Sequence, residues 1–173
     1  MLKMLSTQLI GVFSSVREKE EFPLEDGARL LAQAAVGEGS IFIKGYGEME
    51  GVVMNALKGP EPMKKTKKLE QSSQLSHTDR VIVFTRLSDD QDALSLGKTL
   101  AEKGIPFVSV AGTVKDGAEC LSQLADIHIN THVIKPILPA EDGSRVCIPS
   151  LMSALYIYYG LKFNIDDMLE EYK

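Results

Sequence analysis

Residues 40–51 restrict the possible folds of this chain more than any other stretch. A β-branched and aromatic run, Ile41 to Lys44, ends at Gly45, and a Gly-x-Gly turn leads into apolar residues at helical spacing. Strand, glycine turn and helix form the first half of a βαβ unit. The N–H groups at such a helix start face the turn, and glycines allow positive φ and close approach of a ligand. This stretch therefore predicts a place where an anion such as phosphate sits.

Strand-like and helical segments alternate from residue 40 to residue 130. We predict a buried strand at 81–85, further strands at 41–44, 106–111 and 126–129, an edge strand within the lysine-rich segment 63–76, and helices at 48–57, 88–103 and 117–124. This alternation calls for a parallel sheet with helices on both faces. The predicted fold is α/β, a three-layer α/β/α sandwich of about five parallel strands, with 41–44 and 81–85 as adjacent central strands.

The segments outside this alternation are predicted to be mostly helical. Apolar residues from Leu2 to Val16 follow one helix face, which predicts an extra N-terminal helix over 2–20. Phe22-Pro23 is expected to break the chain before a helix over 24–36, and Pro149 to open a final helix. A brief strand is expected at 145–148, and the last turn, 166–171, as a separate helix. We predict one domain over 1–173, with an N-terminal helix (1–23), a core (24–130) and a loop with the C-terminal helix (131–173).

Composition and charge limit the class of protein. The chain has 173 residues, 44% of them hydrophobic and 25% charged, which is ordinary for one globular domain. A net charge of −5 gives no basic field for nucleic acid, and no segment reads as a membrane span or a signal peptide. Cys120 and Cys147 do not form a disulfide framework. We expect a cytoplasmic protein with no nucleic-acid and no membrane partner.

In a parallel sheet of this type, a ligand lies outside the carboxyl ends of the strands, near the point where strand order reverses. Three loops would line that place: 45–49, 85–89 and 111–117. We therefore expect the binding residues of this chain to come from these loops.

The same loops resemble those of the SIS (sugar isomerase) domain family, which includes the phosphoheptose isomerases. The resemblance covers residues 24 to 130 and, more loosely, the final helix. The family's first strand ends in G-x-G-x-S, where this chain has Gly45-Tyr46-Gly47-Glu48-Met49. Its second motif, S-x-S-G-x-[S/T], corresponds to Thr85-Arg86-Leu87-Ser88-Asp89-Asp90, and its LAD to Leu124-Ala125-Asp126. The chain resembles a small bacterial branch of the family with degenerate motifs.

The resemblance implies a phosphorylated sugar as ligand. Met49 and Leu87 stand where the family has phosphate-binding serines, and Asp90 stands where a hydroxyl is usual. The glycines and the Thr85 hydroxyl carry over. The residues expected to bind the ligand are Gly45, Tyr46, Gly47, Glu48, Met49, Thr85, Arg86 and Ser88.

Both loops have other interpretations. Gly45, Gly47 and Gly51 resemble a dinucleotide fingerprint, which also wants an acidic residue after the second strand, where Glu70 is the nearest candidate. A tight strand-to-helix turn that binds nothing is a further alternative. In the second loop, Ser88 and Gln91 fit a capping box at a helix start, and the neighbouring acidic residues, Asp89 and Asp90, would repel a phosphate.

No catalytic residue is assigned. Aldose–ketose isomerisation needs a general base and a general acid. Glu48 and Glu50 are candidate bases, with His128 and His132 as candidate partners, but none matches a catalytic motif of the family by position. The two histidines share a parity along a strand, yet with Cys147 they do not have the spacing of a recognised metal site. We predict no cofactor and no metal.

Three functions remain open. The preferred one is an SIS-type protein that binds a phosphorylated sugar or related anion. The alternatives are a degenerate SIS-fold protein without catalysis that acts by protein association, and an active aldose–ketose isomerase of sugar phosphates. We also expect a homodimer or higher homo-oligomer, with an interface that includes the 2–16 helix or the final helix with its Tyr156 and Tyr159.

Overall fold

The centre of the molecule is a five-stranded sheet in the order β2-β1-β3-β4-β5, in which every neighbouring pair is parallel. The computed structural model describes residues 1–115 and 119–172. The strands are β1 (Ile41–Gly45), β2 (Thr66–Lys68), β3 (Arg80–Leu87), β4 (Phe107–Gly112) and β5 (Ile127–Asn130). The predicted α/β fold is confirmed, and so is the parallel pairing of β1 with β3, which places Ile43 opposite Ile82.

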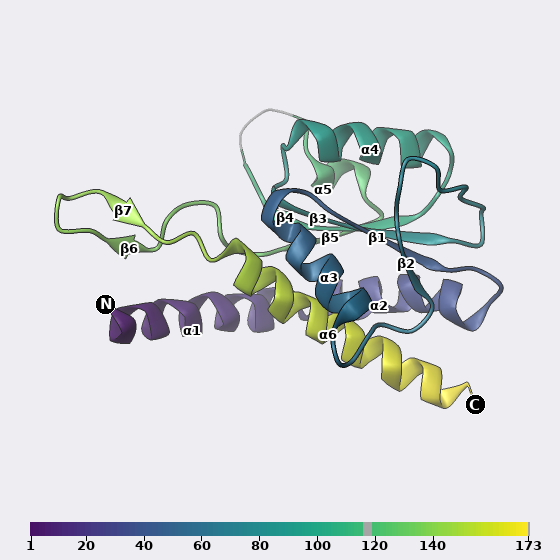
Figure 1. Cartoon of the computed structure of the whole chain (residues 1–173), viewed down its shortest axis with the longest axis horizontal. Coiled ribbons are helices and arrows are strands. Elements are labelled where there is room, and N and C mark those ends of the chain that lie inside the picture. The colour runs from purple at the N-terminus through teal and green to yellow at the C-terminus, as the bar shows by residue number, and fades with distance from the viewer. Residues whose placement is uncertain (116–118, 173) are drawn as a thin grey trace.

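Helices cover both faces of this sheet (Figure 1). One face carries α2 (Glu21–Val36), α3 (Glu50–Lys58) and α6 (Ser150–Glu171), and the other carries α4 (Gln91–Glu102) and the short α5 (Leu121–Leu124). The three central strands, β1, β3 and β4, are buried on both sides because their side chains alternate between two cores. Ile82 and Phe84 enter the core under α2 and α6, whereas Val81 and Val83 enter the core under α4.

Two helices at the start of the chain meet at a single residue. α1 (Leu2–Lys19) ends at Glu20, whose N–H donates to Val16 O, and α2 begins there, with Leu24 N donating to Glu20 O. The break expected at Phe22-Pro23 is wrong. Pro23 is tolerated in the first turn of α2 because the N–H groups of a first turn have no partner within the helix.

Two other predicted helix boundaries are also wrong. α4 begins at Gln91, because Asp90, and not Ser88, is its N-cap and accepts a hydrogen bond from Ala93 N at 2.9 Å. α6 runs without interruption to Glu171, so the last turn is not a separate helix. The helix expected over 117–124 is seen only as α5, and the predicted start, with part of the loop 111–117, lies outside the described residues.

One end of the molecule projects beyond the sheet. The first half of α1 extends from the body, and the antiparallel hairpin of β6 (Leu138–Pro139) and β7 (Arg145–Val146) extends beside it (Figure 1). The stacked rings of Phe13 and Tyr156, 4.7 Å apart, fix the second half of α1 on α6. In the described part of the chain, no helix is long and apolar enough to span a bilayer.

The order of the strands indicates where a ligand site is expected. β1 has β2 on one side and β3 on the other, so the direction in which the chain winds reverses between β1 and β3. In open α/β sheets a ligand binds outside the carboxyl ends of the strands at this switch point. Here the carboxyl ends of β1 and β3 lead into a 3-10 turn (η1, Gly47–Met49) and into the loop before α4.

Candidate functional site

A cleft of about 390 Å³ lies at the carboxyl ends of β1 and β3. We call it the switch-point cleft. The turn after β1 forms one wall and the end of β3 with the following loop forms the other. Its lining residues are Tyr46, Gly47, Glu48, Thr85, Arg86, Leu87, Asp89, Asp90 and Gln91.

The structure brings five of the eight predicted binding residues to this cleft. They are Tyr46, Gly47, Glu48, Thr85 and Arg86. The other three, Gly45, Met49 and Ser88, do not line it. The side chain of Met49 is fully buried in the core. A Cβ on Gly45 would lie 2.5 Å from Met49 O, so this glycine is needed for the turn to fold back on the strand.

Ser88 has a structural role on the far side of its loop. Its side chain is fully buried, its Oγ accepts a hydrogen bond from Val114 N at 2.9 Å, and its N–H donates to Gly112 O. Ser88 therefore ties the loop after β3 to the loop after β4. Four further lining residues, Leu87, Asp89, Asp90 and Gln91, were not predicted as binding residues. Leu87 replaces a serine of the family motif, and the sequence pattern assigned the other three to the start of a helix.

A bulge at the end of β3 presents Arg86 to the cleft. The register between β3 and β4 shifts between Phe84 and Leu87, so the two intervening residues leave the regular ladder. Such bulges re-aim side chains at the end of a strand. Thr85 remains buried, while Arg86 is exposed on the cleft wall.

Arg86 and Glu48 form a two-pronged ion pair from opposite walls of the cleft. Arg86 Nε donates to Glu48 Oε1 at 2.6 Å and Arg86 Nη2 donates to Glu48 Oε2 at 2.9 Å. The hydrogen bonds from Arg86 lower the pKa of the Glu48 carboxyl, and those to Glu48 raise the pKa of the guanidinium. The described lining of the cleft is acidic overall, because Asp89 and Asp90 also belong to it and Arg86 is its one basic residue.

Gly47 leaves one side of the cleft open. Its φ is +57°, and a Cβ built on it would have no heavy atom within 4 Å. The neighbouring N–H of Tyr46 donates to Phe84 O, which fixes the turn to β3. A ligand can therefore approach the backbone of the turn at Gly47.

Tyr46 separates the switch-point cleft from a second one. The second cleft, of about 610 Å³, is lined by Lys44, Tyr46, Leu69, Glu70, Gln71, Asp92, Ser95, Leu96 and Thr99. The Lys44 ammonium lies 5.0 Å from the centroid of the Tyr46 ring. Burial, followed by the charges of Asp92 and Asp90, raises the pKa of Tyr46 to about 12, so its hydroxyl stays neutral at physiological pH.

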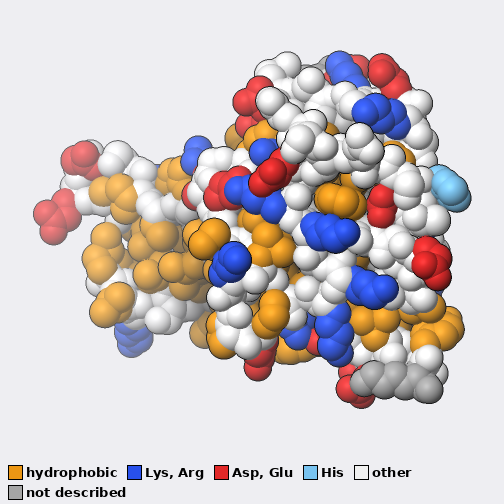
Figure 2. Space-filling view, turned by 45° about the vertical axis from the view of Figure 1, so that its right-hand side comes forward, with side chains coloured by type: hydrophobic (Ala, Val, Ile, Leu, Met, Phe, Trp, Pro, Cys, Tyr) orange, Lys and Arg blue, Asp and Glu red, His pale blue; other side chains and the backbone are white. Residues whose placement is uncertain are grey.

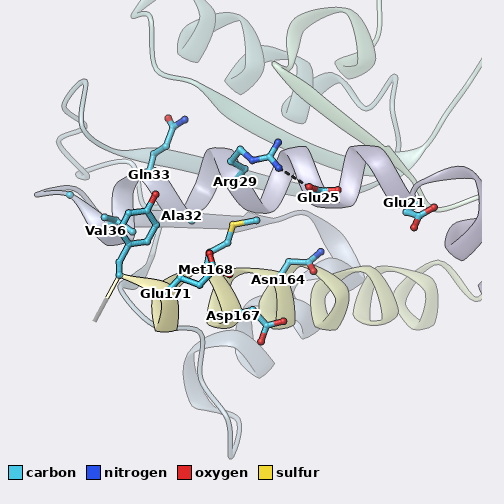
Figure 3. Close-up of a pocket in the computed structure, with 12 residues that line it drawn as sticks. Glu21, Glu25, Arg29, Ala32, Gln33, Val36, Asn164, Asp167, Met168 and Glu171 are labelled. Atoms are coloured by element: carbon cyan, nitrogen blue, oxygen red, sulfur yellow. Dashed lines mark hydrogen bonds and ion pairs between the residues drawn. The ribbon is translucent and has the colours of Figure 1, made fainter.

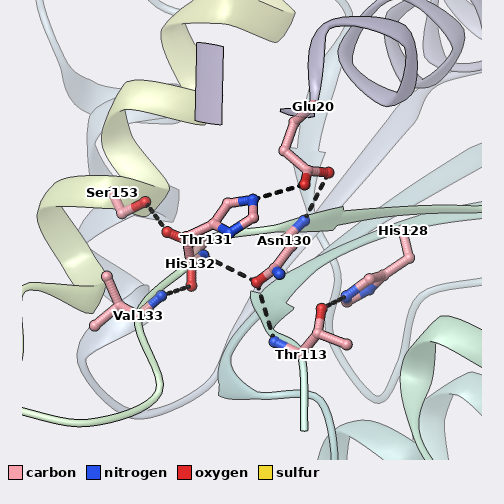
Figure 4. A network of polar contacts seen from close by, with 8 residues as sticks. All are labelled: Glu20, Thr113, His128, Asn130, Thr131, His132, Val133 and Ser153. Atoms are coloured by element: carbon pink, nitrogen blue, oxygen red, sulfur yellow. Dashed lines mark hydrogen bonds and ion pairs between the residues drawn. The ribbon is translucent and has the colours of Figure 1, made fainter. Parts of the chain in front are cut away.

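The histidines considered for catalysis or metal binding belong to a polar network at the ends of β4 and β5 (Figure 4). His128 lies between two hydroxyls, with Nδ1 2.7 Å from Ser109 Oγ and Nε2 2.8 Å from Thr113 Oγ1. His132 instead contacts Glu20, so the two rings have separate partners and do not face one site. Within residues 1–115 and 119–172, no group of three metal-ligating side chains is found.

A larger groove, of about 950 Å³, runs between α2 and the end of α6, away from the strand ends (Figure 3). Acidic side chains prevail along it: Glu21, Glu25, Asp167 and Glu171. The basic residue among its described lining, Arg29, pairs with Glu25 at 2.6 Å and with Asp26 at 3.1 Å. Among the described residues, the groove therefore has no unpaired cation for an anionic ligand.

A family model described as "Domain of unknown function (DUF2529)" matches residues 1–169. This chain belongs to the DUF2529 family. A relative in Bacillus subtilis (strain 168), the uncharacterized protein YwjG, is 40% identical over 173 residues and is aligned over 99% of both chains.

Solved structures share the fold of this DUF2529 chain at low sequence identity. Phosphoheptose isomerase GmhA from Neisseria gonorrhoeae has a TM-score of 0.69 at 13% identity and covers 96% of this chain and 97% of its own. The sugar isomerase domain of the RpiR transcription factor from Sphaerobacter thermophilus has a TM-score of 0.59 at 13% identity, with 98% of this chain and 96% of its own covered. The Vibrio vulnificus NanR protein, complexed with ManNAc-6P, has a TM-score of 0.50 at 16% identity, with 97% and 65% covered. The DUF2529 chain thus has the SIS fold.

Proposed function

We propose that this DUF2529 protein binds a phosphorylated sugar in the switch-point cleft. The observation that carries the proposal is the position of the cleft, at the carboxyl ends of β1 and β3, where the strand order reverses. The names of the SIS-fold neighbours support the class of ligand, since one is a phosphoheptose isomerase and another is complexed with ManNAc-6P.

The lining residues suit the two parts of such a ligand. A guanidinium has five N–H groups, and Arg86 uses two of them on Glu48, which leaves its outer edge for a phosphate. The open backbone at Gly47 offers a second approach to the anion. Carboxylates are acceptors for sugar hydroxyls, and Asp89 and Glu48 both line the cleft. We expect weak binding, because both phosphate-binding serines of the family are replaced here and the acidic lining opposes an anion.

The proposal is for binding rather than for isomerisation. The carboxylate best placed to act as a base is Glu48, and its pKa is lowered by Arg86, which makes it a weaker proton acceptor. His128, whose pKa burial lowers to about 4, is held by two hydroxyls outside the cleft lining. An active isomerase would need another base or a rearranged pair.

A matched pair of glycine variants tests the site. Gly47 and Gly104 both have positive φ (+57° and +65°), and both have open space where a Cβ would lie. Asn tolerates this backbone conformation better than most residues, so Gly47→Asn adds a side chain at the cleft with less strain than most substitutions, and Gly104→Asn adds a matched strain at the end of α4. A panel of sugar phosphates is screened by thermal shift and then by calorimetric titration.

We expect one or more sugar phosphates to raise the melting temperature of the wild type and of Gly104→Asn. Their affinity for Gly47→Asn should be lower by about tenfold or more, which corresponds to about 1.4 kcal/mol of binding free energy. Equal binding to all three folded proteins would place the ligand elsewhere. Lack of binding by the wild type across the panel would instead support the second candidate below.

The second candidate is a protein that acts by association without a sugar ligand. It is favoured by apolar side chains gathered over the projecting end of the molecule (Figure 2). Those exposed on α1, on the 131–149 segment and on the start of α6 are Leu2, Met4, Ile10, Ile134, Val146, Ile148, Met152 and Tyr156. Large exposed apolar patches mark protein interfaces. We propose that a second copy of this chain covers this end, which gives a homodimer under either candidate function.

A further inference from the structure

The basic side chain of the switch-point cleft, Arg86, already forms an ion pair with a carboxylate of the protein itself. The Arg86 guanidinium meets the Glu48 carboxylate edge to edge through Nε and Nη2, at 2.6 and 2.9 Å. This is the geometry in which arginine binds a phosphate, because the same planar fork fits two oxygens of either group. A phosphate in the cleft therefore meets an arginine whose preferred edge is occupied.

The pair bridges the cleft rather than supporting the fold. Glu48 comes from the 3-10 turn after β1, and Arg86 comes from the bulge of β3. The two side chains are 31% and 54% exposed, so both can rotate into solvent without uncovering the core. Both also line the cleft, where a ligand would lie.

We propose that Glu48 is an internal anion that competes with a phosphate group for Arg86 and thereby sets the ligand preference of the switch-point cleft. With Glu48 in place, a phosphate must either displace the carboxylate or accept the weaker contacts of the outer edge of Arg86. A ligand binds most tightly when its phosphate pairs with the Arg86 guanidinium and its hydroxyls donate hydrogen bonds to the displaced Glu48 carboxylate. The cleft then prefers a polyhydroxylated phosphate over a bare one.

This inference rests on the proposed function, and its test is separate from the glycine test. The probe is inorganic phosphate, which reports the anion contact without any sugar. The variant is Glu48→Gln, which keeps the shape of the side chain and removes its charge. The matched control is Glu50→Gln, because Glu50 lies two residues further along, forms a comparable exposed pair with Lys68 at 3.2 Å, and is not part of the cleft lining.

We expect Glu48→Gln to bind phosphate about tenfold or more tightly than the wild type. A neutral Gln amide holds the Arg86 guanidinium less strongly than the Glu48 carboxylate does, because a hydrogen bond between two charged groups contributes more than one to a neutral group. Glu50→Gln should change the affinity by less than about threefold, because an exposed charge outside the cleft is screened by solvent. The double variant Glu48→Gln, Arg86→Gln should lose the gain. In a ¹H–¹⁵N spectrum of arginine side chains, the Arg86 Nε–H signal should shift on Glu48→Gln and shift again as phosphate is added.

Three results would overturn the inference. They are an equal gain in Glu48→Gln and Glu50→Gln, a gain that persists without Arg86, and no gain in Glu48→Gln. Suppose one of these results is found, while sugar phosphates still bind the wild type and fail to bind Gly47→Asn. The proposed function then stands, and Glu48 does not compete with phosphate. If the wild type binds no sugar phosphate but Glu48→Gln gains phosphate binding through Arg86, the competition stands and the proposed function falls.

Discussion

Glu20 Oε1 lies 2.7 Å from His132 Nε2, and this contact joins the α1–α2 junction to the segment that follows β5 (Figure 4). The second carboxylate oxygen of Glu20 accepts a hydrogen bond from Asn130 N at 3.2 Å. The Asn130 side chain in turn accepts from Thr113 N and His132 N. One buried carboxylate thus holds together the ends of β4 and β5, the junction of α1 and α2, and the start of the 131–149 segment.

Replacing Glu20 by Ala should destabilise the protein by about 1–3 kcal/mol. Glu20 is only 8% exposed, so its loss leaves the partly buried N–H of Asn130 without a partner, and this range is the usual cost of an unsatisfied polar group. The control is Glu18→Ala, whose side chain is 64% exposed and whose single pair with Arg17 lies on the surface. Urea unfolding measures both variants. A loss no larger for Glu20→Ala than for Glu18→Ala would show that the network contributes little.

His128 makes the stability depend on pH. Burial lowers its pKa from 6.5 to about 4, so between these values the unfolded state binds a proton that the folded state does not. The free energy of unfolding is therefore highest above pH 6.5 and falls as the pH decreases toward 4. At about 1.4 kcal/mol per pH unit, this histidine accounts for a loss of about 3 kcal/mol.

The contribution of His128 is measured from the slope of stability against pH. Unfolding is followed between pH 4.5 and 7.5 for the wild type, for His128→Asn and for His77→Asn, where His77 is exposed. We expect His128→Asn to flatten the slope, whatever it does to the stability at neutral pH, and His77→Asn to leave the slope as it is. Parallel curves for all three proteins would contradict the assignment.

The Tyr158 hydroxyl is a polar group that the fold leaves unsatisfied. The side chain is fully buried on α6, its oxygen has no hydrogen-bond partner within the described residues, and burial raises its pKa to about 12. Tyr158→Phe should therefore keep the stability or increase it by up to about 1 kcal/mol. Tyr159→Phe is the comparison, because its hydroxyl lies 3.5 Å from Asn55 Nδ2. A clear loss in Tyr158→Phe would mean that its hydroxyl has a bonding partner in solution.

The sheet could be predicted from the sequence because its central strands, β1, β3 and β4, are buried on both faces. Such strands read as continuous apolar runs, and the runs at β1 and β3 are flanked by glycine and by polar residues. The edge strand β2 was located only within a segment of 14 residues, 63–76, because its side chains are mostly exposed and carry no apolar pattern.

The details of the site were harder to predict, because tertiary contacts override local patterns. Ser88 with Gln91 has the pattern of a capping box, but the Ser88 hydroxyl is taken by Val114 N, and Asp90 caps the helix instead. Met49 belongs to the glycine motif by position, yet the 3-10 turn directs it into the core. The pairing of Glu48 with Arg86 joins two segments that lie 38 residues apart, and the spacing of residues within either segment gives no sign of it.

The proposed homodimer should depend on the apolar side chains of α1. Ile10 is 65% exposed on the half of α1 that extends from the body, and a helix so little covered by its own fold gains stability when a second copy packs on it. We expect Ile10→Glu to lower the fraction of dimer at micromolar concentration, because burying an unpaired carboxylate at an interface is unfavourable. The matched control is Met54→Glu on α3, where the side chain is 57% exposed and lies outside the projecting end. Sedimentation velocity of the wild type and both variants gives the answer: a wild-type monomer, or a dimer that Ile10→Glu weakens no more than Met54→Glu does, would remove α1 from the interface.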